Sequence, residues 1–397
     1  MVEATTPEQV GLSTSRLKDL HATMQAFVDD GKFAGLATLI ARRGQIVDSR
    51  CYGKLDIAAD KPVLPDSLFR IYSLTKPITA VAALILFDEG RFDLDEPVSK
   101  WIPGFKKFRV SLTSAGAKLE VGVLEREITF RHLLTHTSGL AYGLMGGPID
   151  ELYAGMKFFS PIGLQLPLRE FVQKLPRLPL VAQPGTIFYY SLAHDVLGYL
   201  IGVISGQPFD VFMRERIFEP LGMPDTGFFV PPDKLQRLGP MYKPRGEAAE
   251  LAVADEVAGS PFVNPDVVPS GGGGLVSSMP DYLRFASMLA NAGELDGVRL
   301  LSRSTFTAMT TNQLPSSAYG EGGFAAGDGY GLGIGVRVAA DPAAGLPAGA
   351  FGWRGASGTT AWVFPHEEMI VIGLAQSFTD STASDTFVRM AYTAIVS

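Results

Sequence analysis

The sequence predicts an α+β fold: one antiparallel sheet flanked by helices and built from both ends of the chain, plus a mostly helical domain. Short strand-like runs joined by tight turns lie at residues 36–41 and 45–52, and more such runs follow residue 330. In the region between these runs, apolar residues mostly recur at helical spacing. We therefore expect residues 1–78 and 232–397 to form a discontinuous α/β domain, and residues 79–231 to form the helical domain.

The first elements have clear start and turn signals. Ser13 is a good N-cap, and Leu17, Leu20 and Met24 follow it at helical spacing, which predicts a helix over residues 13–30. Arg43 and Gly44 separate the first two strand-like runs. This dipeptide predicts a hairpin turn.

A strongly apolar helix follows residue 73. Residues 78–87 are almost all apolar, which predicts a helix buried on every side, and Gly90 is a natural end for it. Pro77 fits only the first turn of a helix, so the helix cannot begin much before Ser73. Ser73 then lies at the helix N-terminus, with Lys76 one turn away on the same face.

The rest of the chain alternates ordered and irregular segments. Residues 129–139 predict a short helix, and another helix follows Asp195 and ends near Gly206. Residues 141–166 and 238–274 are rich in Gly and Pro; we expect the first to form a lid or pocket wall, and the second a loop over the site or a surface tether. The remaining expected elements are helices at 281–292, 302–310 and 384–395, and strands at 330–338, 350–355, 359–364 and 368–375.

Composition limits the class of protein. The 397 residues are 46% hydrophobic and 19% charged, which is typical of a folded globular chain. The net charge is −7, and no basic patch stands out, so we expect neither a nucleic-acid nor an anionic-membrane partner. The sequence sets no oligomeric state.

Cysteine content and the N-terminus bear on location. Cys51 is the single cysteine, so no internal disulfide can form, and an inert buried thiol is expected. The first residues show neither a basic segment nor an apolar segment of a secretory signal, and no apolar run reaches bilayer length. We expect a cytoplasmic protein.

Ser73 and Lys76 are the first candidates for chemistry. A serine at a helix N-terminus can act as a nucleophile if a base lies within hydrogen-bond reach. Serine is also a common N-cap, and a lysine in a first turn is usually solvated, so the S-x-x-K spacing alone is a weak signal. A charge placed on a fully apolar helix is costly, however, which favours a functional role for Lys76.

Other hydrolase motifs are incomplete. No full G-x-S-x-G occurs, which argues against an α/β-hydrolase. His132 and His136 have the spacing of metal ligands but lack the Glu of H-E-x-x-H, so a structural role is expected, and no metal is predicted. Tyr190 is the candidate partner of Lys76. Isolated tyrosine and lysine are poor bases at neutral pH, but side by side in a buried site they can share a proton.

These segments together resemble the serine β-lactamase and penicillin-binding protein superfamily. The chain looks closest to family VIII carboxylesterases, with class C β-lactamases and lovastatin-type acyltransferases as relatives. The matching segments, in order, are S-L-T-K at 73–76, L-L-T-H-T-S-G-L at 133–140, Y-S-L at 190–192, the glycine run at 271–274 and W-R-G at 353–355.

The resemblance implies a β-lactamase-like fold with the site between the two domains, and no cofactor. It implies that Ser73 is the nucleophile and that Tyr190, with Lys76, is the general base and later the acid. The backbone N–H groups of Ser73 and Ala356 would form the oxyanion hole. Trp353, Gly355 and Leu192 would contact the substrate.

Two departures from class C β-lactamases define the expected activity. Leu192 stands where those enzymes have an Asn, and Trp353 stands where they have the Lys of K-T-G. Arg354 is expected to point away, because alternate residues of a strand face opposite sides. We expect a serine carboxylesterase that hydrolyses short-chain esters, a small-molecule substrate class, through an acyl-enzyme, with cephalosporin hydrolysis weak at best. The alternatives are an acyltransferase, a class C-like β-lactamase or D-amino-acid peptidase, and a binding or sensor module without turnover.

Overall fold

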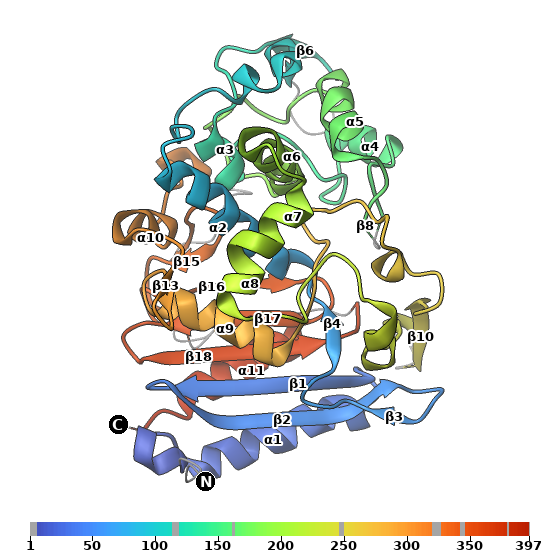
Figure 1. Ribbon diagram of the computed structural model, residues 1–397, viewed down its shortest axis with the longest axis vertical. Helices are drawn as coiled ribbons and strands as arrows, with labels where there is room; N and C mark the ends of the chain where they lie inside the picture. The colour runs from blue at the N-terminus through green and yellow to red at the C-terminus, as the bar shows by residue number, and fades with distance from the viewer. Residues whose placement is uncertain are drawn as a thin grey trace.

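The main sheet is antiparallel and draws its strands from both ends of the chain (Figure 1). A computed structural model describes residues 6–112, 119–160, 163–245, 250–319, 327–341, 346–378 and 381–396. The strand order is β14-β15-β16-β17-β18-β1-β2-β3, so the last strand pairs with the first. The predicted fold class is confirmed. The strands are β1 (Gly35–Arg42), β2 (Gln45–Asp56), β3 (Lys61–Pro62), β14 (Asp328–Tyr330), β15 (Gly335–Arg337), β16 (Phe351–Gly355), β17 (Thr359–Phe364) and β18 (Met369–Ala375).

Both faces of the sheet are covered, and the side-chain alternation of its central strands explains how. Leu36 and Ile40 of β1 pack in one apolar cluster with α1 (Thr14–Asp29) and α11 (Thr382–Thr393). Ala37 and Leu39 face the opposite cluster, which includes α9 (Met279–Ala290). Figure 1 shows α1 beneath the sheet and α9 above it. A strand buried on both faces is mostly apolar, and in β1 only Thr38 and Arg42 are polar.

The middle of the chain supplies most of the remaining helices. The helix α2 (Thr75–Asp88) is buried along almost its whole length and packs against α6 (Ala193–Ser205). The predicted domain limits at residues 78/79 and 231/232 stay a prediction. The other helices are α3 (Phe130–Leu134), α4 (Pro148–Gly155), α5 (Leu168–Lys174), α7 (Phe209–Met213), α8 (Glu219–Leu221) and α10 (Arg303–Met309).

Five two-stranded sheets complete the described fold. They pair β4 (Leu68–Arg70) with β11 (Val276–Ser278), β5 (Arg109–Ser111) with β6 (Val121–Val123), β7 (Phe159–Ser160) with β8 (Gly163–Leu164), β9 (Met241–Arg245) with β10 (Glu250–Asp255), and β12 (Glu294–Leu295) with β13 (Val298–Arg299).

Several predicted elements are shorter or differently divided. The run 330–338 is not one strand, since it includes the end of β14 and the whole of β15. A tight turn separates the two strands, and in this turn the Gly333 N–H donates to the Leu134 carbonyl. The helix predicted to reach Gly139 ends at Leu134, since His136 adopts a left-handed backbone with φ of 54°. The segments 141–166 and 238–274, expected to be irregular, contain α4 and the antiparallel pair of strands β9 and β10. The turn at Arg43 and Gly44 forms as predicted.

The lengths of the described helices bear on whether the chain could cross a membrane. No single helix in the described part of the chain is long and apolar enough to cross a bilayer. One bent pair of helices, Ala193–Ser205 with Phe209–Leu221, is long and apolar enough when the two are taken together, by length and composition alone. The predicted cytoplasmic location stays a prediction.

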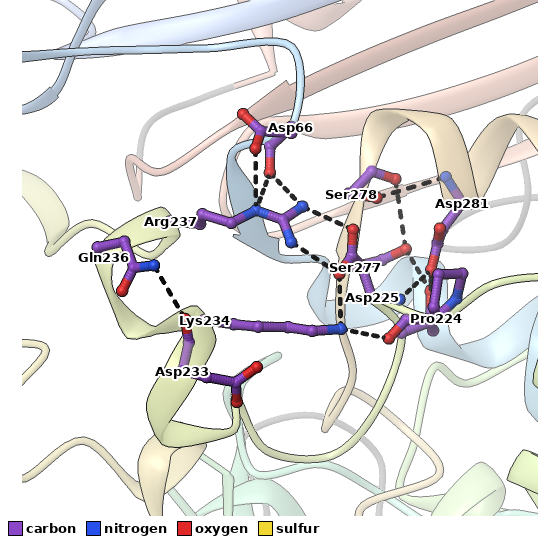
Figure 2. Close-up of polar contacts among 11 residues, drawn as sticks. Asp66, Pro224, Asp225, Asp233, Lys234, Gln236, Arg237, Ser277, Ser278 and Asp281 are labelled. Carbon is purple, nitrogen blue, oxygen red and sulfur yellow. Dashed lines mark hydrogen bonds and ion pairs between the residues drawn. The ribbon is translucent and has the colours of Figure 1, made fainter.

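An ion cluster beside β4 joins three segments of the chain (Figure 2). Asp225 accepts hydrogen bonds from Lys234 Nζ at 2.8 Å and from Arg237 Nη2 at 2.6 Å, and its side chain is 15% exposed. Arg237 also donates to the Asp66 carbonyl, which precedes β4. The hydrogen bonds from Arg237, with those from Lys234, lower the pKa of Asp225 from 3.8 to about 2.

Asp225→Asn should therefore destabilise the protein at neutral pH. Removing the charge takes the shared, mostly buried counter-charge away from Arg237 and Lys234, at a cost of about 1–3 kcal/mol, although Arg237 keeps its contacts with Asp66 and Lys234 keeps the Pro224 carbonyl. Because the folded pKa lies below the unfolded one, this stabilisation is present above pH 4 and is lost as the pH falls toward 2. Urea denaturation at pH 7 and pH 3 measures the difference. Asp66→Asn, at a side chain 59% exposed, is the matched control and should change stability little; an equal loss from both variants contradicts the assignment.

Candidate active site

Ser73 lies at a short, tightly held connection between strand and helix. It follows β4 and belongs to the single turn Tyr72–Leu74, which leads directly into α2. Tyr72 has a left-handed φ of 43°, a costly conformation for an aromatic residue. Its ring is fixed by edge-on contacts with Phe262 and Phe378. The backbone that presents Ser73 is thus determined by packing on both sides.

Lys76 is completely buried and directed at Ser73. Its Nζ donates to Ser73 Oγ at 3.0 Å and to the Gly272 carbonyl at 2.6 Å. The same Nζ lies 4.6 Å from the ring centre of Tyr190 and 5.4 Å from that of Tyr142. A buried amine is tolerated only where such acceptors and ring faces surround it. The serine, lysine and tyrosine predicted from the sequence are therefore brought together.

A buried carboxylate holds the glycine run against Lys76. Asp195 Oδ1 accepts from Ser270 Oγ at 2.6 Å and from the Gly272 N–H at 3.2 Å. Burial raises the pKa of Asp195. A side chain on Gly272 would place its Cβ 2.6 Å from Asp195 Oδ2, so any other residue there would displace this carboxylate. The end of the loop predicted to fold over the site does reach it.

Tyr190 is enclosed by aromatic rings. Its ring stacks on Tyr142 with centres 5.7 Å apart and an interplanar angle of 15°, and it contacts Trp353 at 5.8 Å. Trp353 Nε1 donates to the Tyr190 hydroxyl at 3.4 Å. The hydroxyl is thus oriented by Trp353, which also lines the pocket beside Ser73.

Ser73 and Ala356, the two predicted oxyanion-hole residues, lie close to each other at the end of β16. A Cβ on Gly355 would lie 2.5 Å from the Ile71 carbonyl and 3.3 Å from the Ser73 nitrogen, so the end of β16 approaches the Ser73 turn closely. Ser357 Oγ fixes this approach by donating to the Arg70 carbonyl at 2.9 Å. Ala356, between Gly355 and Ser357, lines the same pocket as Ser73.

A pocket of about 420 Å³ opens over these groups. Its walls are mostly apolar, and they are formed by Ser73, Met145, Phe188, Tyr190, Trp353, Arg354, Gly355, Ala356, Gly358, Ser381 and Ser384. Leu192, predicted to contact substrate, is buried at the start of α6 and is not among the lining residues. Arg354 lies at the pocket but pairs with Asp385 of α11 at 3.0 Å.

Sequence reasoning missed several residues of the site. Met145 falls in the segment predicted as a pocket wall, but nothing singled it out. Phe188, Ser381 and Ser384 carried no motif signal. A larger cavity of about 550 Å³, beside Phe228 and Lys234, contains none of the predicted site residues. Among the described residues, no group of three or more His, Cys, Asp or Glu side chains is placed to hold a metal ion.

Fold and pocket together define the class as a serine hydrolase with a β-lactamase-like fold. The chain belongs to the beta-lactamase family, whose profile matches residues 20–394. The predicted kinship with family VIII esterases of the β-lactamase and penicillin-binding protein superfamily is confirmed.

Three relatives illustrate this kinship. Protein Rv1367c of Mycobacterium tuberculosis (strain ATCC 25618 / H37Rv) is 37% identical over 91% of this chain and 90% of its own length. Esterase EstB of Burkholderia gladioli is 33% identical over 87% of this chain and 86% of its own. The solved structure of EstCE1, described as a hydrolase with promiscuous acyltransferase activity, superposes with a TM-score of 0.80 at 27% identity, covering 96% and 99% of the two chains.

Gly355→Ala should lower activity strongly in a folded protein. The new methyl group would push β16 away from the Ser73 turn and misplace an oxyanion donor, a change that costs about 100- to 1000-fold in kcat elsewhere. Steady-state ester hydrolysis, with circular dichroism for folding, measures the effect. Gly155→Ala is the control, because a Cβ there meets nothing within 4 Å. Unchanged kcat in Gly355→Ala would mean that this approach does not build the oxyanion hole.

Proposed function

We propose that the protein is a serine carboxylesterase that hydrolyses short-chain, neutral esters through an acyl-enzyme on Ser73. The observation that carries the proposal is the 3.0 Å contact between the buried Lys76 Nζ and Ser73 Oγ, beside Tyr190 and at the base of an apolar pocket. The names of EstB and EstCE1, an esterase and a hydrolase, support the same reaction class.

Acylation begins when Ser73 Oγ attacks the ester carbonyl carbon. The hydroxyl proton passes to the Lys76–Tyr190 pair as the new C–O bond forms. The carbonyl oxygen gains negative charge, which the backbone N–H groups of Ser73 and Ala356 stabilise. When the tetrahedral intermediate collapses, the bond to the alcohol oxygen breaks, and the pair returns the proton to that oxygen.

Deacylation repeats these steps with water. A water molecule attacks the acyl-enzyme carbonyl carbon and gives its proton to the same pair. The bond between the acyl carbon and Ser73 Oγ then breaks, and Ser73 recovers a proton. The products are a carboxylic acid and a free enzyme in its starting protonation state.

The pocket favours uncharged substrates. Trp353 gives it an apolar wall, and the nearby Arg354 is occupied by Asp385. A substrate carboxylate would lose its hydration without gaining a dedicated cation. Leu192, which is buried and does not line the pocket, offers no amide group for a lactam or peptide.

Acyl transfer is the second candidate reaction. It uses the same acyl-enzyme, with an alcohol in place of the deacylating water. The specific observation that favours it is the apolar lining beside Ser73, where an organic alcohol can compete with water. The acyltransferase activity in the description of EstCE1 supports it as well.

Ser73→Ala should lower kcat by several orders of magnitude, leaving about 10³–10⁴-fold catalysis over water from the oxyanion hole and binding. A serine-reactive phosphonate should inactivate the wild-type enzyme and add its mass to the peptide that carries Ser73. Label on another serine, with Ser73→Ala still active, would contradict the assignment. Absence of both label and turnover in the wild type would favour a binding or sensor module.

The enzyme should prefer p-nitrophenyl butyrate to nitrocefin in kcat/KM. A buried charge that loses its partner costs about 2–5 kcal/mol, and this converts to a factor of about 30 to several thousand. A class C β-lactamase run alongside corrects for the better leaving group of the ester. Adding an acyl-acceptor alcohol measures transfer in the same assay. Lactamase-like hydrolysis of nitrocefin with slow ester turnover would reject the esterase proposal in favour of a β-lactamase.

A further inference from the structure

We infer that His136 is a positioning residue that fixes Tyr190 for proton transfer to the departing alcohol. The inference rests on the proposed function, because it takes Tyr190 to be part of the acid–base pair. Sequence reasoning assigned His136 only a structural role. Its place in the fold, against the backbone on both sides of Tyr190, gives it a more specific one.

Two hydrogen bonds tie the neighbours of Tyr190 to this single residue. The His136 carbonyl accepts from the Tyr189 N–H at 2.8 Å. His136 Nδ1 accepts from the Ser191 N–H at 3.2 Å, and Ser191 Oγ lies at the same distance. The residues before and after Tyr190 are therefore anchored to one residue, which restricts the backbone that carries the phenol.

The left-handed backbone of His136 makes this double contact compatible with the end of α3. Its φ is 54°, a conformation in which His, Asn and Asp are enriched among non-glycine residues. The ring also packs on Tyr190 with centres 4.6 Å apart, and on His194 at 4.8 Å. His136 is completely buried, so water does not compete for its hydrogen bonds.

The protonation state required for this role is the neutral one. Nδ1 must carry a lone pair to accept from the Ser191 N–H, so the ring proton lies on Nε2. Burial, reinforced by His194 and Lys76, lowers the pKa of His136 well below its usual value. The neutral ring, with its acceptor at Nδ1, is thus the favoured form at neutral pH.

Loss of this anchor should affect poor leaving groups most. A p-nitrophenolate departs without a proton, whereas an ethoxide needs one from the acid. A misplaced Tyr190 therefore steepens the dependence of kcat/KM on the leaving group. A general loss of folded enzyme lowers all esters by one factor and leaves this dependence unchanged.

The experiment compares p-nitrophenyl, phenyl, trifluoroethyl and ethyl butyrate across a set of variants. His136→Leu and His136→Gln remove the acceptor at the Nδ1 position, and His136→Asn keeps an acceptor there and tolerates the left-handed backbone. We expect Leu and Gln to lose about 10- to 100-fold more on ethyl than on p-nitrophenyl butyrate, and Asn to restore the wild-type slope. His132→Leu is the matched control, because the His132 ring bonds at the start of α3.

The variant Tyr190→Phe separates the positioning role of His136 from the acid–base role of Tyr190. If it steepens the slope and the double variant with His136→Gln is no steeper, the two residues act as one unit and the inference holds. If Tyr190→Phe steepens the slope but neither Gln nor Leu does, the positioning role is wrong while the proposed function stands. If Tyr190→Phe itself leaves the slope unchanged, the acid–base assignment of the proposed function fails. Should His136→Leu not fold, the comparison of Gln with Asn decides.

Discussion

Burial of the Lys76 amine is the constraint on which the rest of the site depends. An amine removed from water is costly unless acceptors replace its hydration. Here the acceptors are Ser73 Oγ and the Gly272 carbonyl, with ring faces on two further sides. The interactions that allow α2 to bury the Lys76 amine are therefore the same ones that hold this amine against the Ser73 hydroxyl.

To surround the buried amine and the Ser73 turn, backbone segments from distant parts of the chain must come close to one another. Gly272 lies near the end of the segment 238–274 and is held by Asp195 from α6. Gly355 ends a strand of the main sheet and lies against the turn that contains Ser73. Both contacts exclude a side chain. The site thus joins the sheet, α2, α6 and the glycine run into one rigid unit, as pre-organised catalysis demands.

The pocket wall is coupled to the same unit. Asp150 accepts hydrogen bonds from the Gly143 and Leu144 N–H groups and from the Tyr189 hydroxyl. Met145, the next residue, lines the pocket, and Tyr189 precedes Tyr190. One buried carboxylate therefore links the segment that contains Met145 to the segment that carries Tyr190. Under the proposed function, a change in either segment should affect both substrate choice and proton transfer.

Apolar period and turn residues in the sequence predicted the antiparallel sheet, and the resemblance of its motifs to known proteins predicted the family. The sequence also offered Ser73, Lys76 and Tyr190 as a catalytic set, which the structure places together and whose roles stay a prediction. The run 330–338 was wrongly predicted as one strand, and Leu192, predicted to contact substrate, is buried, since both depend on what packs against them. Met145, Phe188 and Ser384 line the pocket, and the sequence did not predict them as site residues. Only the tertiary structure could decide these, because contacts between residues hundreds of positions apart leave no periodic trace in either segment.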